Sequence, residues 1–161
     1  MRLEPFGKLV LRYTQASWHR PFGGEEGAGF GAGDGELTGM LEGSVSWSNF
    51  PRRREDGVWT PNVRGYIKTA DGDEILLSIH GQSVLEKVAN HRAILARIEL
   101  TTEVERHRWL NTSFLVGEGE IDEDRGELWI TTYVCVNEQA QGPPGIGEDP
   151  PQPFRQSGRK P

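Results

Sequence analysis

The sequence predicts an all-β fold, either a β-sandwich or a closed antiparallel barrel. Short segments of alternating apolar and polar residues recur along the chain, polar turns separate them, and helical patterns are brief. The clearest signal is the stretch 62–81 (NVRGYIKTADGDEILLSIHG), in which two alternating segments flank a turn at 70–73. Asp-Gly in such a turn is a strong hairpin signal, because glycine adopts a positive φ at no steric cost. Evenly spaced short strands with polar turns are typical of sandwiches and barrels.

The remaining predicted strands are 36–48, 93–103, 113–120 and 127–137. Only the segments 84–88 and 103–110 have a helical pattern, and both are short. The glycine-dense stretch 23–43 does not match the G-x-G-x-x-G motif of dinucleotide-binding loops, because Glu36 stands where a motif starting at Gly31 needs glycine. We interpret it as a flexible loop that leads into a strand.

Residues 1–138 are predicted to form one domain, and residues 139–161 a disordered tail. The tail holds six of the ten prolines and almost no aliphatic residues, so burial cannot offset the entropy lost on folding.

Composition excludes several classes of partner and cofactor. The net charge of −6 argues against a nucleic-acid or membrane-surface binder, which needs clustered positive charge. The single cysteine, Cys135, excludes a cysteine-based metal cluster, and the four histidines lack metal-ligand spacing, so no metal and no cofactor are expected. The N-terminal segment has no apolar signal region, which predicts a cytoplasmic protein. A homodimer is expected because two-fold dimers are the commonest oligomers.

Polar side chains gather on one face of the predicted strand 62–69, where Arg64, Tyr66 and Lys68 lie opposite an apolar face. Alternation does not say which face is inside, and the pattern alone favours a polar face that points to water. In a barrel with a polar lumen, several side chains would instead share one cavity with tryptophans: Arg64, Glu99, Tyr133 and His80. Trp109 and Asn111 fit two interpretations equally, a pocket mouth or a core tryptophan beside an asparagine that satisfies a turn.

An ordered set of short motifs spans roughly residues 35 to 136. Its members are GELTG at 35–39, Gly43, Trp47, Asp-Gly at 56–57, NVRG at 62–65, TADG at 69–72, Gly81, WLN at 109–111 and VGEG at 116–119. With this set the chain resembles the bacterial family called domain of unknown function 3237. The resemblance implies a closed antiparallel barrel of about eight strands, of the lipocalin or allene-oxide-cyclase type, with a central pocket. It also implies that Trp47, Arg64, Trp109 and Asn111 face this pocket.

Two positions depart from the family pattern. Ser46 and Asn62 stand where the family tends to have aspartate, so neither position offers a general base. Arg64 therefore lacks its nearest acid, which favours an anionic group on a ligand or pairing with Glu42 or Glu99.

Three hypotheses about function follow. The first is a small-molecule-binding barrel for a polar or anionic, partly aromatic ligand; its binding residues would be Arg64, Asn111, Trp47, Trp59 and Trp109. The second is an isomerase, cyclase or lyase that uses an acid–base pair from Glu99, His80 and Tyr133. The third is a non-catalytic oligomeric interaction module.

Overall fold

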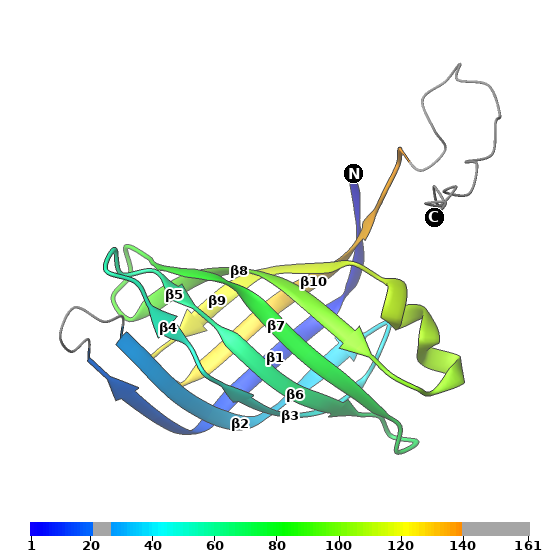
Figure 1. Ribbon diagram of the computed structural model, residues 1–161, viewed down its shortest axis with the longest axis horizontal. Coiled ribbons are helices and arrows are strands. Elements are labelled where there is room, and N and C mark those ends of the chain that lie inside the picture. Colours follow the sequence, from blue (N-terminus) through cyan, green and yellow to red (C-terminus); the bar gives the residue numbers. More distant parts are fainter. Residues whose placement is uncertain (21–26, 140–161) are drawn as a thin grey trace, which may run out of the picture.

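A computed structural model of the protein describes residues 1–20 and 27–139, and its main strands close into an eight-stranded antiparallel β-barrel (Figure 1). Around the barrel these strands are β1 (Arg2–His19), β2 (Gly27–Gly39), β3 (Gly43–Asn49), β6 (Asn62–Lys68), β7 (Glu74–Leu85), β8 (His91–Thr101), β9 (Leu115–Asp122) and β10 (Glu127–Val136). The barrel closes because β1 pairs with both β2 and β10. The predicted closed barrel is therefore confirmed.

The β6–β7 hairpin forms as the sequence predicts, with Gly72 at a φ of +88° in its turn. A 3-10 helix, η1 (Glu105–Thr112), follows β8 at one end of the barrel (Figure 1). The tail predicted to be disordered lies outside the described residues from position 140 onward.

Four local predictions are corrected. Residues 2–19 form the longest strand although none was predicted there, and the glycine-dense stretch forms β2 over most of its described part instead of a loop. The predicted strand 36–48 divides at 40–42 between β2 and β3. The predicted helix at 84–88 is absent, because Val84 and Leu85 continue β7 by pairing with β8. For β1, β2 and the end of β7, pairing with a neighbouring strand outweighs the local preference of the residues. At 40–42 the chain instead turns between two paired strands.

A short hairpin extends the barrel wall at the end opposite η1 (Figure 1). It consists of β4 (Arg52–Arg53) and β5 (Trp59–Thr60), which lie between the ends of β2 and β7. Gly27 and Ala28 pair with β4, and Trp59 pairs with Ser83. This insertion widens one end of the barrel, while η1 covers the other.

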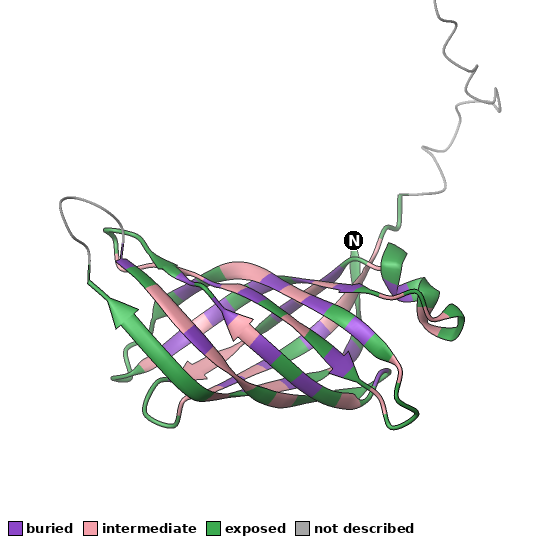
Figure 2. Ribbon diagram, turned by 60° about the horizontal axis from the view of Figure 1, so that its bottom comes forward, coloured by how far each residue is buried: buried purple, intermediate pink, exposed green. Residues whose placement is uncertain are grey.

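The half of the barrel nearer η1 is packed with aliphatic side chains. Buried and exposed residues alternate along the strands, as expected when one face of a sheet is the core (Figure 2). Leu110 of η1 is buried against this core. A void between the core side chains of this half measures only about 10 Å³. This void is too small for a ligand.

Among the described residues, no helix is both long enough and apolar enough to cross a membrane.

Strand β7 offers a matched test of this packing. Ile79 is 0% exposed and Leu76, three residues earlier, is 63% exposed. Replacing Ile79 with alanine should lower the free energy of unfolding by about 2–5 kcal/mol, because it leaves a cavity in the core. Leu76→Ala should change it by less than about 0.5 kcal/mol. Urea denaturation measures both values, and similar losses for the two variants would contradict the assignment of inner and outer faces.

Candidate ligand-binding cavity

A cavity of about 510 Å³ opens at the end of the barrel that carries β4 and β5. Its volume lies within the roughly 300–1,000 Å³ typical of small-molecule sites. The lining residues that matter most for its chemistry are Tyr13, Trp18, Asn49, Trp59, Ser83 and Arg92.

Three aromatic rings line one wall of the cavity, and a fourth ring, that of Trp47, packs behind Tyr13. Trp47 is 5% exposed at the inner end, and its ring lies edge-on to Tyr13 at 4.7 Å between centroids. Tyr13 contacts Trp18 at 6.3 Å, and Trp18 contacts Trp59 at 5.3 Å. Trp18 is 53% exposed, so the four rings run from the interior to the mouth. Such a wall suits an apolar or aromatic ligand.

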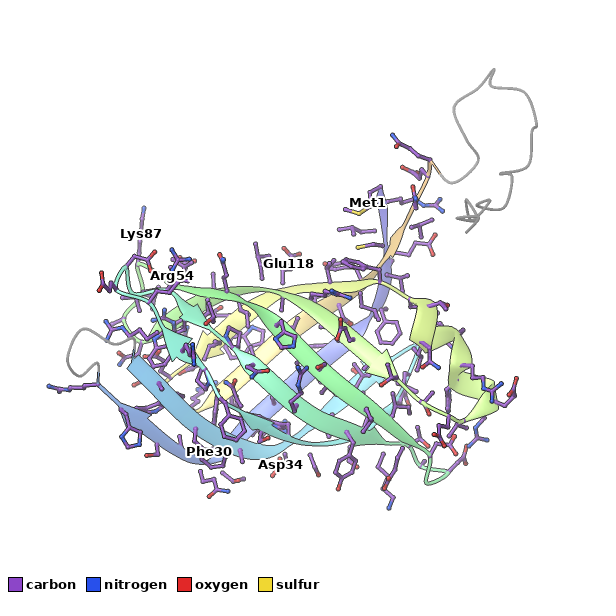
Figure 3. All side chains as sticks on the ribbon, viewed as in Figure 1. Met1, Phe30, Asp34, Arg54, Lys87 and Glu118 are labelled. Atoms are coloured by element: carbon purple, nitrogen blue, oxygen red, sulfur yellow. The ribbon has the colours of Figure 1, made fainter. Side chains whose placement is uncertain are left out.

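The glycines of β2 make room for these rings. A Cβ atom at Gly31 would lie 2.3 Å from the ring of Tyr13, and one at Gly29 would lie 2.2 Å from the ring of Trp18. Figure 3 shows the side chains of Phe30 and Asp34 pointing away from the barrel, as expected when the alternating glycines face inward. The glycine-rich segment thus serves ring packing, and not a phosphate-binding loop.

Arg92 is the buried cation of the cavity, with only 7% of its surface exposed. Its Nε donates to Ser83 Oγ at 3.3 Å, and its Nη2 donates to the carbonyl oxygens of Gly57 at 2.8 Å and Ser83 at 3.1 Å. Its Nη1 makes no hydrogen bond to the described residues, and the carboxylate that it faces, Glu123, is 3.8 Å away. Burial lowers the pKa of the Arg92 guanidinium, and the Glu123 charge opposes this effect. Arg92 therefore has a charged donor to offer an anionic group.

The carbonyl of Gly57 reaches Arg92 because of a tight turn between β4 and β5. Gly57 has a φ of +80°, a conformation that favours glycine, and its N–H donates to Arg54 O at 3.0 Å. The basic run 52–54 is exposed, and Arg54 pairs with Asp56 at 2.7 Å.

Tyr13 and Asn49 form a second polar group of the cavity. Asn49 Oδ1 accepts the backbone N–H of Asn62 at 2.9 Å, and Asn49 Nδ2 donates to Tyr13 Oη at 3.2 Å. Burial raises the pKa of Tyr13, so its hydroxyl stays protonated at neutral pH.

Asp122 also lines the cavity, but its carboxylate is engaged in a turn. Its Oδ1 accepts the backbone N–H groups of Asp124 and Arg125, each at 3.0 Å. Within residues 1–20 and 27–139, no three His, Cys, Asp or Glu side chains come together as a metal site.

The expected lumen position of Arg64 is corrected. Its side chain is exposed on the outer face of β6 with Tyr66 and Lys68, while Val63 and Ile67 are buried inside. The physical reason is the two-residue period of a strand, which places Arg64 opposite the aliphatic face.

The three candidate catalytic residues also lie on the outer face, so the expectation that they meet in one cavity is corrected. Glu99 pairs with Arg97 at 2.6 Å, and Tyr133 Oη donates to Glu118 Oε1 at 3.1 Å. His80 lines a shallow surface depression. Each alternates with buried aliphatic residues of its own strand.

The remaining predicted residues divide between the two ends of the barrel. Trp59 lines the cavity, and Trp47 lies behind Tyr13. Trp109 and Asn111 lie on η1 at the far end, so the structure does not bring them near the cavity. Trp109 packs against Phe6 at 6.1 Å.

A family model described as "Protein of unknown function (DUF3237)" matches residues 28–135. The chain belongs to this family. No curated protein matches the sequence of this DUF3237 protein.

Solved structures share the fold at low sequence identity. A protein of unknown function from Clostridium acetobutylicum is 14% identical with a TM-score of 0.74, over 84% of this chain and 100% of that one. A beta-barrel like protein from Acinetobacter baumannii is 16% identical with a TM-score of 0.73, over 83% and 94%. An enzyme from Penicillium herquei is 18% identical with a TM-score of 0.62, over 83% and 94%. These likenesses establish the barrel fold of the DUF3237 protein.

Sequence reasoning missed Arg92, Tyr13 and Asn49, although each is in phase with buried neighbours. Arg92 precedes the alternating inner residues of β8, which begin at Ile94. Tyr13 follows Leu9 and Leu11 at a spacing of two in the same way. The usable signal was a polar residue that continues an aliphatic face at the end of a strand.

Asn111 has a structural role that can be tested. Its Oδ1 accepts the N–H of Thr102 at 2.8 Å, and its Nδ2 donates to the carbonyl of Thr102 at 2.9 Å, which ties η1 to the end of β8. Asn111→Ala should lower the free energy of unfolding by about 1–2 kcal/mol, because both hydrogen bonds are lost. Glu103→Ala, at an exposed neighbouring position, is the control. Unchanged stability of the Asn111 variant in urea denaturation would contradict this structural role.

Proposed function

We propose that this barrel binds a small molecule that carries one anionic group, such as a carboxylate, on an aromatic or other apolar body. The observation that carries the proposal is Arg92, a buried guanidinium in the wall of the cavity whose Nη1 makes no hydrogen bond within the described residues. Nη1 lies beyond hydrogen-bond distance of Glu123, so it can donate a charge-assisted hydrogen bond to a ligand anion.

The aromatic wall supports an apolar ligand body. The rings of Tyr13, Trp18 and Trp59 line the cavity and leave a space that can bury most of a small molecule. Trp59 keeps the wall role that the sequence predicted, whereas Arg92 takes the anion-binding role that the sequence assigned to Arg64.

The charges around the cavity favour a singly charged ligand. Two cations, Arg53 and Arg92, and two carboxylates, Asp122 and Glu123, belong to the described lining. A doubly charged phosphate would meet the two carboxylates without enough positive charge to offset them. A carboxylate needs only the pair of donors that Arg92 offers.

An isomerase, cyclase or lyase is the second candidate. It is favoured by the half-buried, protonated Tyr13 hydroxyl, which could act as an acid, and by the Penicillium herquei neighbour, which is described as an enzyme. Such a reaction also needs a base. Within the described lining, Asp122 is engaged by two backbone N–H groups, so Glu123 is the available carboxylate. Binding without turnover requires fewer assumptions and is the leading proposal.

The wider sequence predictions are retained as proposals. They are a bacterial origin, a cytoplasmic location and a homodimer, with the non-catalytic interaction module as a third functional candidate. Sedimentation equilibrium tests the dimer.

The role of Arg92 is tested with 2-naphthoate, a small aromatic carboxylate, by isothermal titration calorimetry. Arg92→Met should weaken binding about 10- to 100-fold, because a charge-assisted hydrogen bond contributes about 1.5–3 kcal/mol. Arg92→Lys keeps the charge but loses the paired donors, so it should bind with intermediate affinity. The uncharged 2-methylnaphthalene should bind both variants and the unchanged protein equally.

Arg64→Met is the matched control, because Arg64 is an exposed arginine on the outer face. It should leave the affinity for 2-naphthoate unchanged. Equal weakening by Arg64→Met and a correctly folded Arg92→Lys variant would overturn the assignment of the anion site to Arg92. Far-ultraviolet circular dichroism reports the folding of each variant.

Glu123 should compete with the ligand anion for Arg92. Its Oε1 lies 3.8 Å from Arg92 Nη1, and its side chain is 44% exposed. Glu123→Gln should strengthen 2-naphthoate binding about 2- to 5-fold, because a partly exposed ion pair of about 0.5–1 kcal/mol no longer has to be broken. Glu103→Gln makes the same change in net charge at an exposed position and should have no effect. An equal gain for both variants would mean that net charge, and not competition at Arg92, governs affinity.

A further inference from the structure

The direction of the hydrogen bonds around Asn49 is fixed by the backbone. The N–H of Asn62 can only donate, so the atom of Asn49 that faces it at 2.9 Å must be the oxygen. The other amide atom, Nδ2, can only donate, and it lies 3.2 Å from Tyr13 Oη. Tyr13 is therefore the acceptor in this contact, and its own proton is not used by Asn49.

Among residues 1–20 and 27–139, no group accepts the hydroxyl proton of Tyr13. A ligand bound in the cavity could supply this acceptor. Asn49 is the hydrogen-bond partner that the described residues give to Tyr13 Oη. The ring is held between Trp47 and Trp18, and both Tyr13 and Asn49 line the cavity. The hydroxyl of the half-buried Tyr13 can therefore donate its proton to a ligand oxygen in the cavity.

We propose that the ligand carries a neutral hydrogen-bond acceptor, such as a carbonyl oxygen, in addition to its anionic group, and that Tyr13 donates to this acceptor. The inference rests on the proposed function because it concerns the same cavity. Tyr13 and the free nitrogen of Arg92 both act as donors, so the matching ligand class is an apolar or aromatic carboxylate with a keto, ester or amide oxygen. Asn49 is a positioning residue, because it sets the direction in which the Tyr13 proton points.

Two derivatives of the same probe separate this inference from the proposed function. They are 6-acetyl-2-naphthoate, which carries a carbonyl acceptor, and 6-isopropyl-2-naphthoate, which has a similar shape and no acceptor. Calorimetry gives the ratio of their dissociation constants for each variant. Relative to the unchanged protein, Tyr13→Phe should reduce the preference for the acetyl compound roughly 3- to 10-fold, the equivalent of one hydrogen bond.

The variant Asn49→Asp tests the direction in which the hydroxyl proton of Tyr13 points. Its carboxylate accepts from both Asn62 N–H and Tyr13 Oη–H, so the Tyr13 proton turns away from the ligand. The preference for the acetyl compound should fall as it does in Tyr13→Phe. The new negative charge weakens both carboxylate probes, and this common effect cancels in the ratio. Tyr133→Phe removes a hydroxyl from the outer face and should leave the ratio unchanged.

Infrared spectroscopy of the bound acetyl group gives a direct readout. Donation by Tyr13 should lower its carbonyl stretching frequency in the unchanged protein and in Tyr133→Phe, but not in Tyr13→Phe. A purely structural role of Tyr13 would not move this frequency. Equal ratios for the unchanged protein and Tyr13→Phe, or failure of both derivatives to bind where 2-naphthoate binds, would overturn the inference and leave the proposed function standing. Failure of 2-naphthoate itself to bind would overturn both.

Discussion

Closure of the barrel depends on β1, whose backbone pairs with β2 along one edge and with β10 along the other. Without it, both neighbours would end in unpaired edges, which are prone to association with other chains. Its 18 residues are long enough to close the packed half and also to reach the rim of the cavity. An irregularity between Tyr13 and Gln15 changes the phase of the strand, so that both Tyr13 and Trp18 face inward. The strand that closes the barrel thus also carries two of the three aromatic rings that line the cavity.

Inward-facing and outward-facing residues alternate in both halves of the barrel, but the inward-facing residues fill the interior of one half and leave the other half open. Near η1 the inward positions are aliphatic and fill the interior, which supplies most of the hydrophobic stabilisation. Toward β4 and β5 the inward positions are glycines, aromatic rings and a few polar groups, so the interior stays open. Because the packed half holds the strands in register, the polar groups of the open half keep their positions without a filled core around them.

The alternating pattern predicted most of the strands other than β1 and the family resemblance predicted the barrel, but neither located the site. Alternation is a local property, so it revealed the β6–β7 hairpin and the two faces of β8. Which face is inside is decided by closure, which involves residues far apart in the chain. For Arg64 the pattern alone favoured the outer face, and the family resemblance moved it inside incorrectly. Arg92 was missed because it lies one residue before the segment in which the alternation was recognised. β1 was missed because its irregularity interrupts the alternation and hides its strand character.

The environment of Arg92 has a consequence for how such a site can be recognised among related sequences. Two of the three oxygen atoms that hold its guanidinium are backbone carbonyls, from Gly57 and Ser83. Every amino acid supplies a carbonyl, so these contacts impose no paired substitutions on the sequence. What they require is the path of the chain, above all the length of the connection between β4 and β5. Related proteins would keep such an anion site by keeping the length of this loop and an arginine at the end of a strand. A comparison of residue identities alone would not detect the site.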